Sequence, residues 1–297
     1  MTSRPLPATA DVAADALVRE AVARARGAQL GWDLLGVDAR AQILERFRQA
    51  LYARRDEVAT LISRENGKPA VEATMTEVAT ALDFARYYGR IAADVLAPRR
   101  LTSATLALWR KRITITHAPH GVVAVISPWN YPFMLPAGIV MPALLAGNAV
   151  LLKPSELTPA CGALLAEMLR AAGVPTDVLQ VLQGDGTIRA AVARGDVDKV
   201  FFTGSVSTGR KVAHACAERF VPCALELGGG ATRRSSATTP TWSTRRAGSP
   251  GALLQRWADL RRPQTRLRGG AGPRSFRGGD AAAPAGVAAQ TPRRTTV

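Results

Sequence analysis

The chain of 297 residues is 47% apolar and is long enough for one large domain or two smaller ones. Its net charge of +16 would ordinarily favour nucleic acid or an acidic membrane surface as a partner. Residues 231–297, however, hold 13 arginines, no lysine and two acids, so +11 of this charge lies there and residues 1–230 are only mildly basic. The three cysteines form no CxxC pair and no metal-ligand spacing with the three histidines, which predicts no metal site and favours a reducing, cytoplasmic setting.

Residues 11–98 follow a helical pattern. Apolar residues recur at helical spacing between positions 41 and 51, with charged and polar residues between them. The segment Glu65–Pro69, with glycine followed closely by proline, supplies a helix stop, and a second helix is expected over about 70–97. Residues 112–117 alternate between polar and apolar side chains as a strand would.

From Gly121 onward the pattern changes to alternating strands and helices. Val122–Ile126 is a continuous apolar run, which is typical of a parallel strand buried on both faces. Further strands are expected at 149–152, 178–182, 199–202 and from 224, and helices at about 133–146, 158–172, 190–194 and 206–219. This alternation predicts an α/β fold with a doubly wound parallel sheet, in which ligands bind at the carboxyl ends of the strands.

The segment Tyr131–Leu152 carries no charge over 22 residues and could be taken for a membrane span. It contains three prolines and the turn signal Gly147-Asn148, so a buried helix, turn and strand is the better interpretation.

The segment 231–297 has one phenylalanine and no isoleucine, methionine or tyrosine. It cannot bury enough apolar surface to offset the entropy of ordering. We therefore expect an N-terminal helical segment over 1–98, a dinucleotide-binding domain over 99–230 and a disordered, arginine-rich tail over 231–297.

Four motifs stand at the ends of expected strands, where this architecture places its site. Ser127–Pro132 (SPWNYP) follows the first strand, and Lys153–Glu156 (KPSE) follows the second. Phe202–Ser205 (FTGS) follows the fourth strand, and Glu226–Gly229 (ELGG) follows the fifth. Each motif alone could be a tight turn, but their shared placement and order make them specific together.

With these motifs and the helix end at Glu65–Pro69, residues 11–229 resemble the N-terminal half of an aldehyde dehydrogenase. The likeness stops at Gly230, where the family usually has lysine, and a complete family member is considerably longer. The resemblance implies a Rossmann-like NAD-binding domain, a small aldehyde as substrate and a homo-oligomer. Neither a membrane nor nucleic acid is expected as a partner.

The resemblance implies roles for the residues at the cofactor site. Lys153 would hydrogen-bond the adenosine ribose, and Glu156 would accept from its 2′-hydroxyl and repel a 2′-phosphate, which favours NAD over NADP. Gly204 would let the backbone approach closely, and Ser205 begins a helix whose first amides favour the pyrophosphate. The alternatives are a solvated Lys–Glu turn, an N-cap serine and simple turn glycines. The cofactor-binding residues expected are Ser127, Pro128, Trp129, Lys153, Ser155, Glu156, Gly184, Gly186, Phe202, Thr203, Gly204, Ser205, Leu227 and Gly228.

Two residues are expected to be catalytic. Asn130 carries an amide donor that could stabilise the oxyanion of a thiohemiacetal, although an asparagine between aromatic residues is more often a turn residue. Glu226 resembles the family's general base, which activates the water that hydrolyses the acyl-enzyme. A buried structural glutamate is the alternative there, and Trp129 is expected near the substrate tunnel.

The family's nucleophile has no counterpart in this chain. In the family a cysteine thiolate attacks the aldehyde, hydride passes to nicotinamide, and water releases the acid. The resemblance places this cysteine at position 260, which is Leu260 here. Cys161, Cys216 and Cys223 fall within expected helices or the start of a strand, and we interpret them as buried core residues.

We hypothesise that the residues after 230 are the family's coding sequence read out of frame. GC-rich codons read off-register yield arginine, alanine, proline, glycine, serine and threonine, which is the composition of this segment. Back-translation from the second base of the Trp257 codon permits Gly-Gln-(Ile or Thr)-Cys, with cysteine at the expected position. Back-translation from the third base of the Ala231 codon permits Asp-Pro-Ala-Ile-Val in a different register, so two slips are required.

The first functional hypothesis is therefore NAD-dependent oxidation of an aldehyde to a carboxylic acid by family. This chain would be inactive because the nucleophilic cysteine and the catalytic domain are missing, and homo-oligomer formation is doubtful because part of the assembly surface is missing too. The alternative is a catalytically dead dinucleotide-fold remnant whose basic tail binds nucleic acid non-specifically. Clustered arginines without interleaved aromatic residues give only salt-sensitive attraction.

The frameshift hypothesis requires a TGC triplet across codons 260 and 261. Sequencing of the locus measures this directly, and a gene without that triplet would contradict the hypothesis.

Overall fold

The computed structural model describes residues 9–101 and 113–228. The arginine-rich segment 231–297, which includes position 260, lies outside the described residues, and so do the predictions made for it.

The N-terminal part is helical, as its sequence pattern predicts. Its elements are α1 (Thr9–Leu34), α2 (Val37–Ala53), α3 (Arg55–Asn66), α4 (Ala70–Ala73), the π-helix η1 (Thr74–Val78) and α5 (Ala79–Leu96). Helix α3 ends at the predicted stop, because Gly67 takes the left-handed conformation (φ +75°) and donates its N–H to the Ser63 carbonyl at 3.0 Å. The helix expected over 70–97 is the continuous run of α4, η1 and α5, with one π-helical turn inside it.

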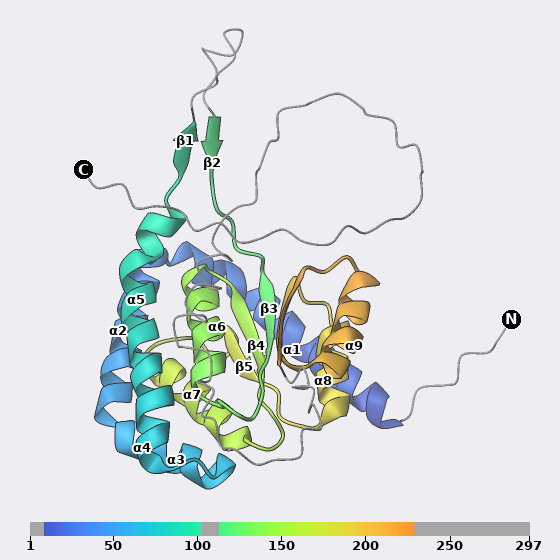
Figure 1. Ribbon diagram of the computed structural model, residues 1–297. Helices are drawn as coiled ribbons and strands as arrows, with labels where there is room; N and C mark the ends of the chain where they lie inside the picture. The colour runs from blue at the N-terminus through green and yellow to red at the C-terminus, as the bar shows by residue number, and fades with distance from the viewer. Residues whose placement is uncertain (1–8, 102–112, 229–297) are drawn as a thin grey trace, which may run out of the picture. The chain divides into compact units, whose positions relative to one another are not determined.

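Strands β1 (Arg99–Leu101) and β2 (Ile113–Ile115) pair antiparallel in a two-stranded sheet of their own (Figure 1). The pattern at 112–117 predicted β2. Strand β1 was not predicted, because three residues are too few to show an alternation.

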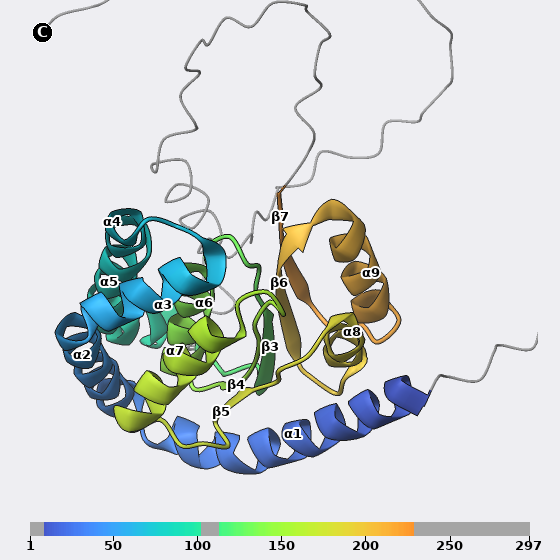
Figure 2. The ribbon, with the colours of Figure 1, turned by 90° about the horizontal axis from the view of Figure 1, so that it is seen from below.

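The main sheet has five parallel strands in the order β5-β4-β3-β6-β7 within the described residues. The order reverses beside β3, which confirms the doubly wound α/β fold. The strands and their connecting helices are β3 (Val122–Ile126), α6 (Met134–Leu145), β4 (Ala149–Lys153), α7 (Pro159–Ala171), β5 (Leu179–Val181), α8 (Gly186–Arg194), β6 (Lys199–Ser205), α9 (Val206–Ala217) and β7 (Cys223–Gly228). Figure 2 shows α8 and α9 on one side of these strands and α6 and α7 on the other.

Three elements extend further than the sequence pattern indicates. Strand β6 continues to Ser205 and β7 to Gly228, because Thr203 pairs with Glu226 and Ser205 with Gly228 across the ladder. These two site motifs therefore lie within strands rather than after them. Helix α8 begins at Gly186, four residues before the expected start, because the Asp185 carboxylate caps it by accepting from the Thr187 amide at 2.8 Å.

Both faces of the sheet are covered by apolar side chains. Alternate residues of β3 and β4 pack with α1, α8 and α9 on one face, in a cluster that includes Val22, Ala124, Leu151, Val192 and Phe202. Helix α6 is buried almost throughout, which explains the uncharged stretch at 131–152 as core. Within the described residues, no helix has the length and apolarity needed to cross a membrane.

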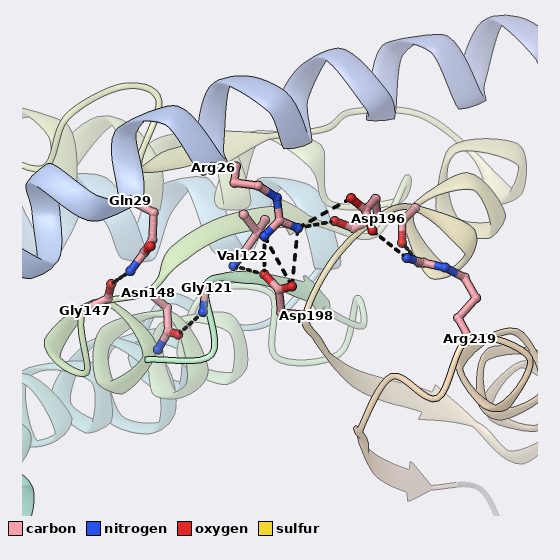
Figure 3. Close-up of polar contacts among 10 residues, drawn as sticks. Arg26, Gln29, Gly121, Val122, Gly147, Asn148, Asp196, Asp198 and Arg219 are labelled. Atoms are coloured by element: carbon pink, nitrogen blue, oxygen red, sulfur yellow. Dashed lines mark hydrogen bonds and ion pairs between the residues drawn. The ribbon is translucent and has the colours of Figure 1, made fainter. Parts of the chain in front are cut away.

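A polar network fixes α1 to the amino-terminal edge of the sheet. Asp198, just before β6, accepts from the Val122 amide at 2.6 Å and from Arg26 of α1 at 3.0 Å. Figure 3 shows Arg26 directed between Asp196 and Asp198. Gln29, one turn further along α1, donates to the Gly147 carbonyl at 2.8 Å ahead of β4. Hydrogen bonds from α1 thus reach the residues just before β4 and β6, and Asp198 links the same network to β3.

Replacing Asp198 by alanine tests this connection. The change leaves the buried Val122 amide without its side-chain acceptor and Arg26 without its nearest carboxylate, so we expect the free energy of unfolding to fall by about 1–3 kcal/mol. Urea unfolding followed by circular dichroism measures it. The control is Asp94→Ala at an exposed acid of α5, which should change stability by less than about 0.5 kcal/mol. Equal effects of the two substitutions would contradict the proposed anchoring.

Candidate functional site

The predicted site residues lie at the carboxyl ends of neighbouring strands. Ile126 of β3 pairs with Lys153 of β4 on one side and with Phe202 of β6 on the other, and Phe202 pairs in turn with Leu225 of β7. These four residues therefore lie level across the sheet, and β6 and β7 continue three residues beyond them. The four sequence motifs meet at one edge, next to the position where the strand order reverses.

The motif after β4 is built around a buried ammonium group. Lys153 is only 1% exposed, and its Nζ donates to the Pro154 carbonyl at 2.8 Å and to Glu156 Oε2 at 3.3 Å. Burial lowers the pKa of Lys153, and Glu156 opposes that shift. Ser155 is also buried, and its hydroxyl oxygen accepts from the Leu157 amide at 3.2 Å. The alternative of a solvated turn therefore does not describe Lys153.

Arg189 of α8 is a second cation beside Glu156 and was not predicted from the sequence. Its Nη1 lies 3.4 and 3.5 Å from the two carboxylate oxygens. A hydrogen bond from the backbone amide of Glu156, followed by Lys153 and Arg189, holds the pKa of the Glu156 carboxyl below its usual range. The carboxylate is therefore ionised at neutral pH and has cations on both sides. Strands β4 and β5 pair side by side, and this brings the loop after β4, with Glu156, close to helix α8, which follows β5. No local sequence signal could therefore have indicated the contact between Glu156 and Arg189.

A surface pocket of about 490 Å³ opens beside this carboxylate. It is lined by Glu156, Pro159, Ala160, Gln183 and Gly184. Gly184 has φ +137°, and a Cβ there would lie 2.5 Å from the Ile188 side chain, so the turn itself requires glycine. This position is thus a turn glycine and also part of the pocket wall.

Ser127 supplies an unused polar group at the same edge. Its amide donates to the Lys153 carbonyl at 3.1 Å, and its side chain is buried. Within the described residues, the Ser127 hydroxyl has no hydrogen-bond partner. Buried hydroxyls are nearly always paired, so this one is suited to a polar ligand at the end of β3. Pro128, which follows it, is half-buried.

The motif at the end of β6 leads into the first turn of α9. Ser205 caps this helix, because its hydroxyl oxygen accepts from the Thr208 amide at 3.3 Å. The N-cap alternative is thus correct for its side chain, and other amides of the first turn remain available to an anion. Phe202 is buried in the core, and a Cβ on Gly204 would lie 2.7 Å from its ring. The absence of a side chain at Gly204 therefore leaves room for the Phe202 ring beside the backbone.

The two residues expected to be catalytic are exposed. Asn130 lies in the loop after β3, beside the 54% exposed Trp129, and Glu226 lies on β7. Strand β6 lies between β3 and β7, so these two strands are about 10 Å apart across the sheet. Because Glu226 is exposed, the alternative of a buried structural glutamate is wrong. Leu227 beside it packs against Gly209 of α9.

A buried ion pair from the N-terminal helical part holds the backbone of the loop that contains Asn130. Lys68 Nζ donates to the Asn130 carbonyl at 3.0 Å and to Glu77 Oε1 at 2.6 Å. Glu77 is fully buried, and its other oxygen accepts from the amides of Phe133 and Met134 at the start of α6. The sequence pattern around Lys68 indicated only the end of a helix. The single available signal for Glu77 was a charged residue on the inner side of a predicted helix.

The family of the chain follows from comparisons with known proteins. Residues 5–233 match the model of the aldehyde dehydrogenase family. The chain belongs to this family. It is 42% identical over 236 residues to N-succinylglutamate 5-semialdehyde dehydrogenase 1 of Caulobacter vibrioides, covering 76% of this chain and 48% of that protein. It is 41% identical over 229 residues to a Mycolicibacterium smegmatis protein assigned as a succinate-semialdehyde dehydrogenase [NADP(+)], covering 77% and 43%.

Solved structures agree on the fold. An NAD-dependent aldehyde dehydrogenase from Sinorhizobium meliloti matches with TM-score 0.67 and 34% identity, over 71% of this chain and 42% of that one. The chain thus spans less than half the length of these relatives. Aldehyde dehydrogenases use NAD or NADP, and the buried Lys153, the unpaired Ser127 hydroxyl and the first turn of α9 fit the adenosine ribose and phosphates of either cofactor.

Replacing Lys68 by methionine tests the support beneath the Asn130 loop. The change keeps most of the packing but leaves the buried Glu77 carboxylate without a cation, so we expect unfolding free energy to fall by about 3–5 kcal/mol. The double substitution Lys68→Met and Glu77→Gln should recover part of this loss. Denaturant unfolding measures both. Lys211→Met, at an exposed lysine of α9, is the matched control, and a loss no larger than the control's would contradict the assigned role.

Proposed function

We propose that this chain carries the adenosine-binding half of a nicotinamide dinucleotide site and that NAD is one of its ligands. The observation that carries the proposal is the buried Lys153 ammonium, paired with Glu156 at the carboxyl end of β4 beside a pocket. An ionised carboxylate next to a ribose accepts hydrogen bonds from its hydroxyls, which is how dinucleotide folds hold NAD. The unpaired Ser127 hydroxyl and the first amides of α9 support the same ligand.

For the whole protein of the family type, we propose oxidation of an aldehyde to a carboxylic acid. The relatives are named for semialdehydes, which favours a substrate of that class. The Asn130 amide would donate to the oxyanion that develops on the substrate, and Glu226 would take a proton from the attacking water. The nicotinamide cofactor, when bound, supplies a hydride acceptor.

We propose that this chain does not itself carry out the oxidation. All three of its cysteines lie in the described elements α7, α9 and β7. Burial raises the pKa of the Cys161 thiol far above its usual range, and burial together with the neighbouring Cys223 raises that of Cys216 to about 11. Both thiols are therefore protonated at neutral pH, whereas attack on a carbonyl requires a thiolate. Cys223 lies on β7 ahead of Glu226 and so does not correspond to the family's nucleophile. Leu260 stands at the position of that nucleophile, and we attribute the absence of a cysteine there to out-of-frame reading of the residues after 230.

Calorimetric titration of the full 297-residue chain with ADP-ribose tests the proposed site. We expect binding, and we expect Lys153→Met to weaken it by about tenfold or more because a charge-assisted hydrogen bond to the ligand is lost. Lys199→Met removes the same charge at the opposite edge of the sheet and should leave the affinity unchanged. No binding by folded protein would overturn the proposal. NADH formation from an aldehyde would contradict only the predicted inactivity.

A further inference from the structure

Two cations flank Glu156, and they come from different elements. Lys153 ends β4 and approaches one carboxylate oxygen at 3.3 Å, while Arg189 of α8 approaches both oxygens at 3.4 and 3.5 Å. Lys153 is buried and also bonded to a carbonyl, so it is held in place. The side chains of Arg189 and Glu156 are 29% and 41% exposed, so their ion pair can open toward solvent.

The position of Arg189 depends on a glycine one turn earlier. A Cβ on Gly186 would lie 2.9 Å from Arg189 Nη2, so the guanidinium folds back over the first turn of α8. Asp185 is a further charged group near this turn, and its carboxylate is engaged in capping α8 through the Thr187 amide. The Arg189 guanidinium therefore faces Glu156 at the edge of the pocket rather than extending along the helix.

This arrangement changes what Glu156 does to a phosphorylated ribose. A lone carboxylate beside the ribose repels a 2′-phosphate and selects NAD. A carboxylate paired with a guanidinium repels less, and a guanidinium can bind phosphate through two parallel hydrogen bonds. Partly exposed ion pairs are weak, so exchanging the Glu156 carboxylate for a phosphate on Arg189 requires little free energy.

Resting on the proposed function, we propose that Arg189 is a specificity-determining residue that lets this site accept a 2′-phosphorylated adenosine ribose, and hence NADP, as well as NAD. Glu156 binds the 2′-hydroxyl of the unphosphorylated ribose. With a phosphorylated ribose Glu156 turns outward, and Arg189 binds the phosphate in its place. The family alone does not decide this point, because one relative is named for NADP and another for NAD.

Arg194 provides an internal standard on the same helix. It also pairs with a carboxylate, Asp15 of α1, at 3.0 Å, but its partner lies outside the strand-end loops. Replacing Arg194 removes the same charge from α8 without touching Glu156. Any effect specific to Arg189 is thereby separated from a general loss of positive charge.

The experiment is a calorimetric titration of the full chain with two probes, ADP-ribose and 2′-phospho-ADP-ribose. The unaltered chain should bind both, with affinities within about tenfold of each other. Arg189→Gln should lower the affinity for 2′-phospho-ADP-ribose by about 10–100-fold, because a pair of charged hydrogen bonds to the phosphate is lost. The same substitution should leave the affinity for ADP-ribose almost unchanged. Glu156→Gln should raise the affinity for the phosphorylated probe relative to that for ADP-ribose, and Arg194→Gln should leave the ratio of the two affinities unchanged. Circular dichroism checks that each variant is folded.

Three results would overturn the proposal while the proposed function stands. The first is that the chain binds ADP-ribose but not 2′-phospho-ADP-ribose. The second is that Arg189→Gln weakens the binding of both probes equally. The third is that Arg194→Gln changes the ratio of the two affinities as much as Arg189→Gln does. Binding of neither probe by folded protein would overturn the proposed function, and this proposal with it.

Discussion

Strand β3 pairs in parallel with β4 on one side and β6 on the other, and every residue of it is buried. Parallel neighbours cannot be joined by a tight turn, so each connection must cross the sheet as a helix. The chain runs outward from β3 to β4 and β5 and then returns past β3 to β6 and β7, so α6 and α7 cover one face and α8 and α9 the other (Figure 2). The loops after β3, β4 and β6 lie at the same edge of the sheet and lead to helices on opposite faces. All the candidate binding groups, from Ser127 to Ser205, reach the site through this one constraint.

Much of this framework could be predicted from local pattern. The unbroken apolar run Val122–Ile126 predicted a strand because a strand buried on both faces has no polar side to alternate with. The ends of β6 and β7 were harder to predict, because Gly204 and Gly228 have low strand propensity and are held only by pairing with the neighbouring strand. Helix α8 began early for a similar reason, since the cap at Asp185 outweighs the poor helix propensity of Gly186.

The side-chain contacts could not be predicted in the same way. Arg26 and Asp198 are 172 positions apart, and Arg189 and Glu156 are 33 apart. Hydrophobic periodicity tells which face of an element is buried but not which element covers it. Lys68 and Glu77 make the point within the N-terminal helices. Their ion pair joins the segment between α3 and α4 to the π-helical turn of η1, and Lys68 also donates to the Asn130 carbonyl in the loop after β3. Neither the π-helical turn nor the approach of that loop can be read from the residues Lys68 and Glu77 alone.

Burial divides the candidate site into two halves. On the side of the proposed adenosine site Ser127, Lys153 and Ser155 are buried, so the fold holds these groups whether or not a ligand is present. On the catalytic side Trp129, Asn130 and Glu226 are exposed. Oxyanion stabilisation and proton abstraction both gain strength from exclusion of water, because charge interactions are weakened in a high dielectric. The groups of the proposed cofactor site are therefore held in place by packing, while the exposed groups would have to be covered before the chemistry proposed for them can be efficient. Of the two proposed roles, recognition of the adenosine ribose is accordingly the one that depends on groups already held by the fold.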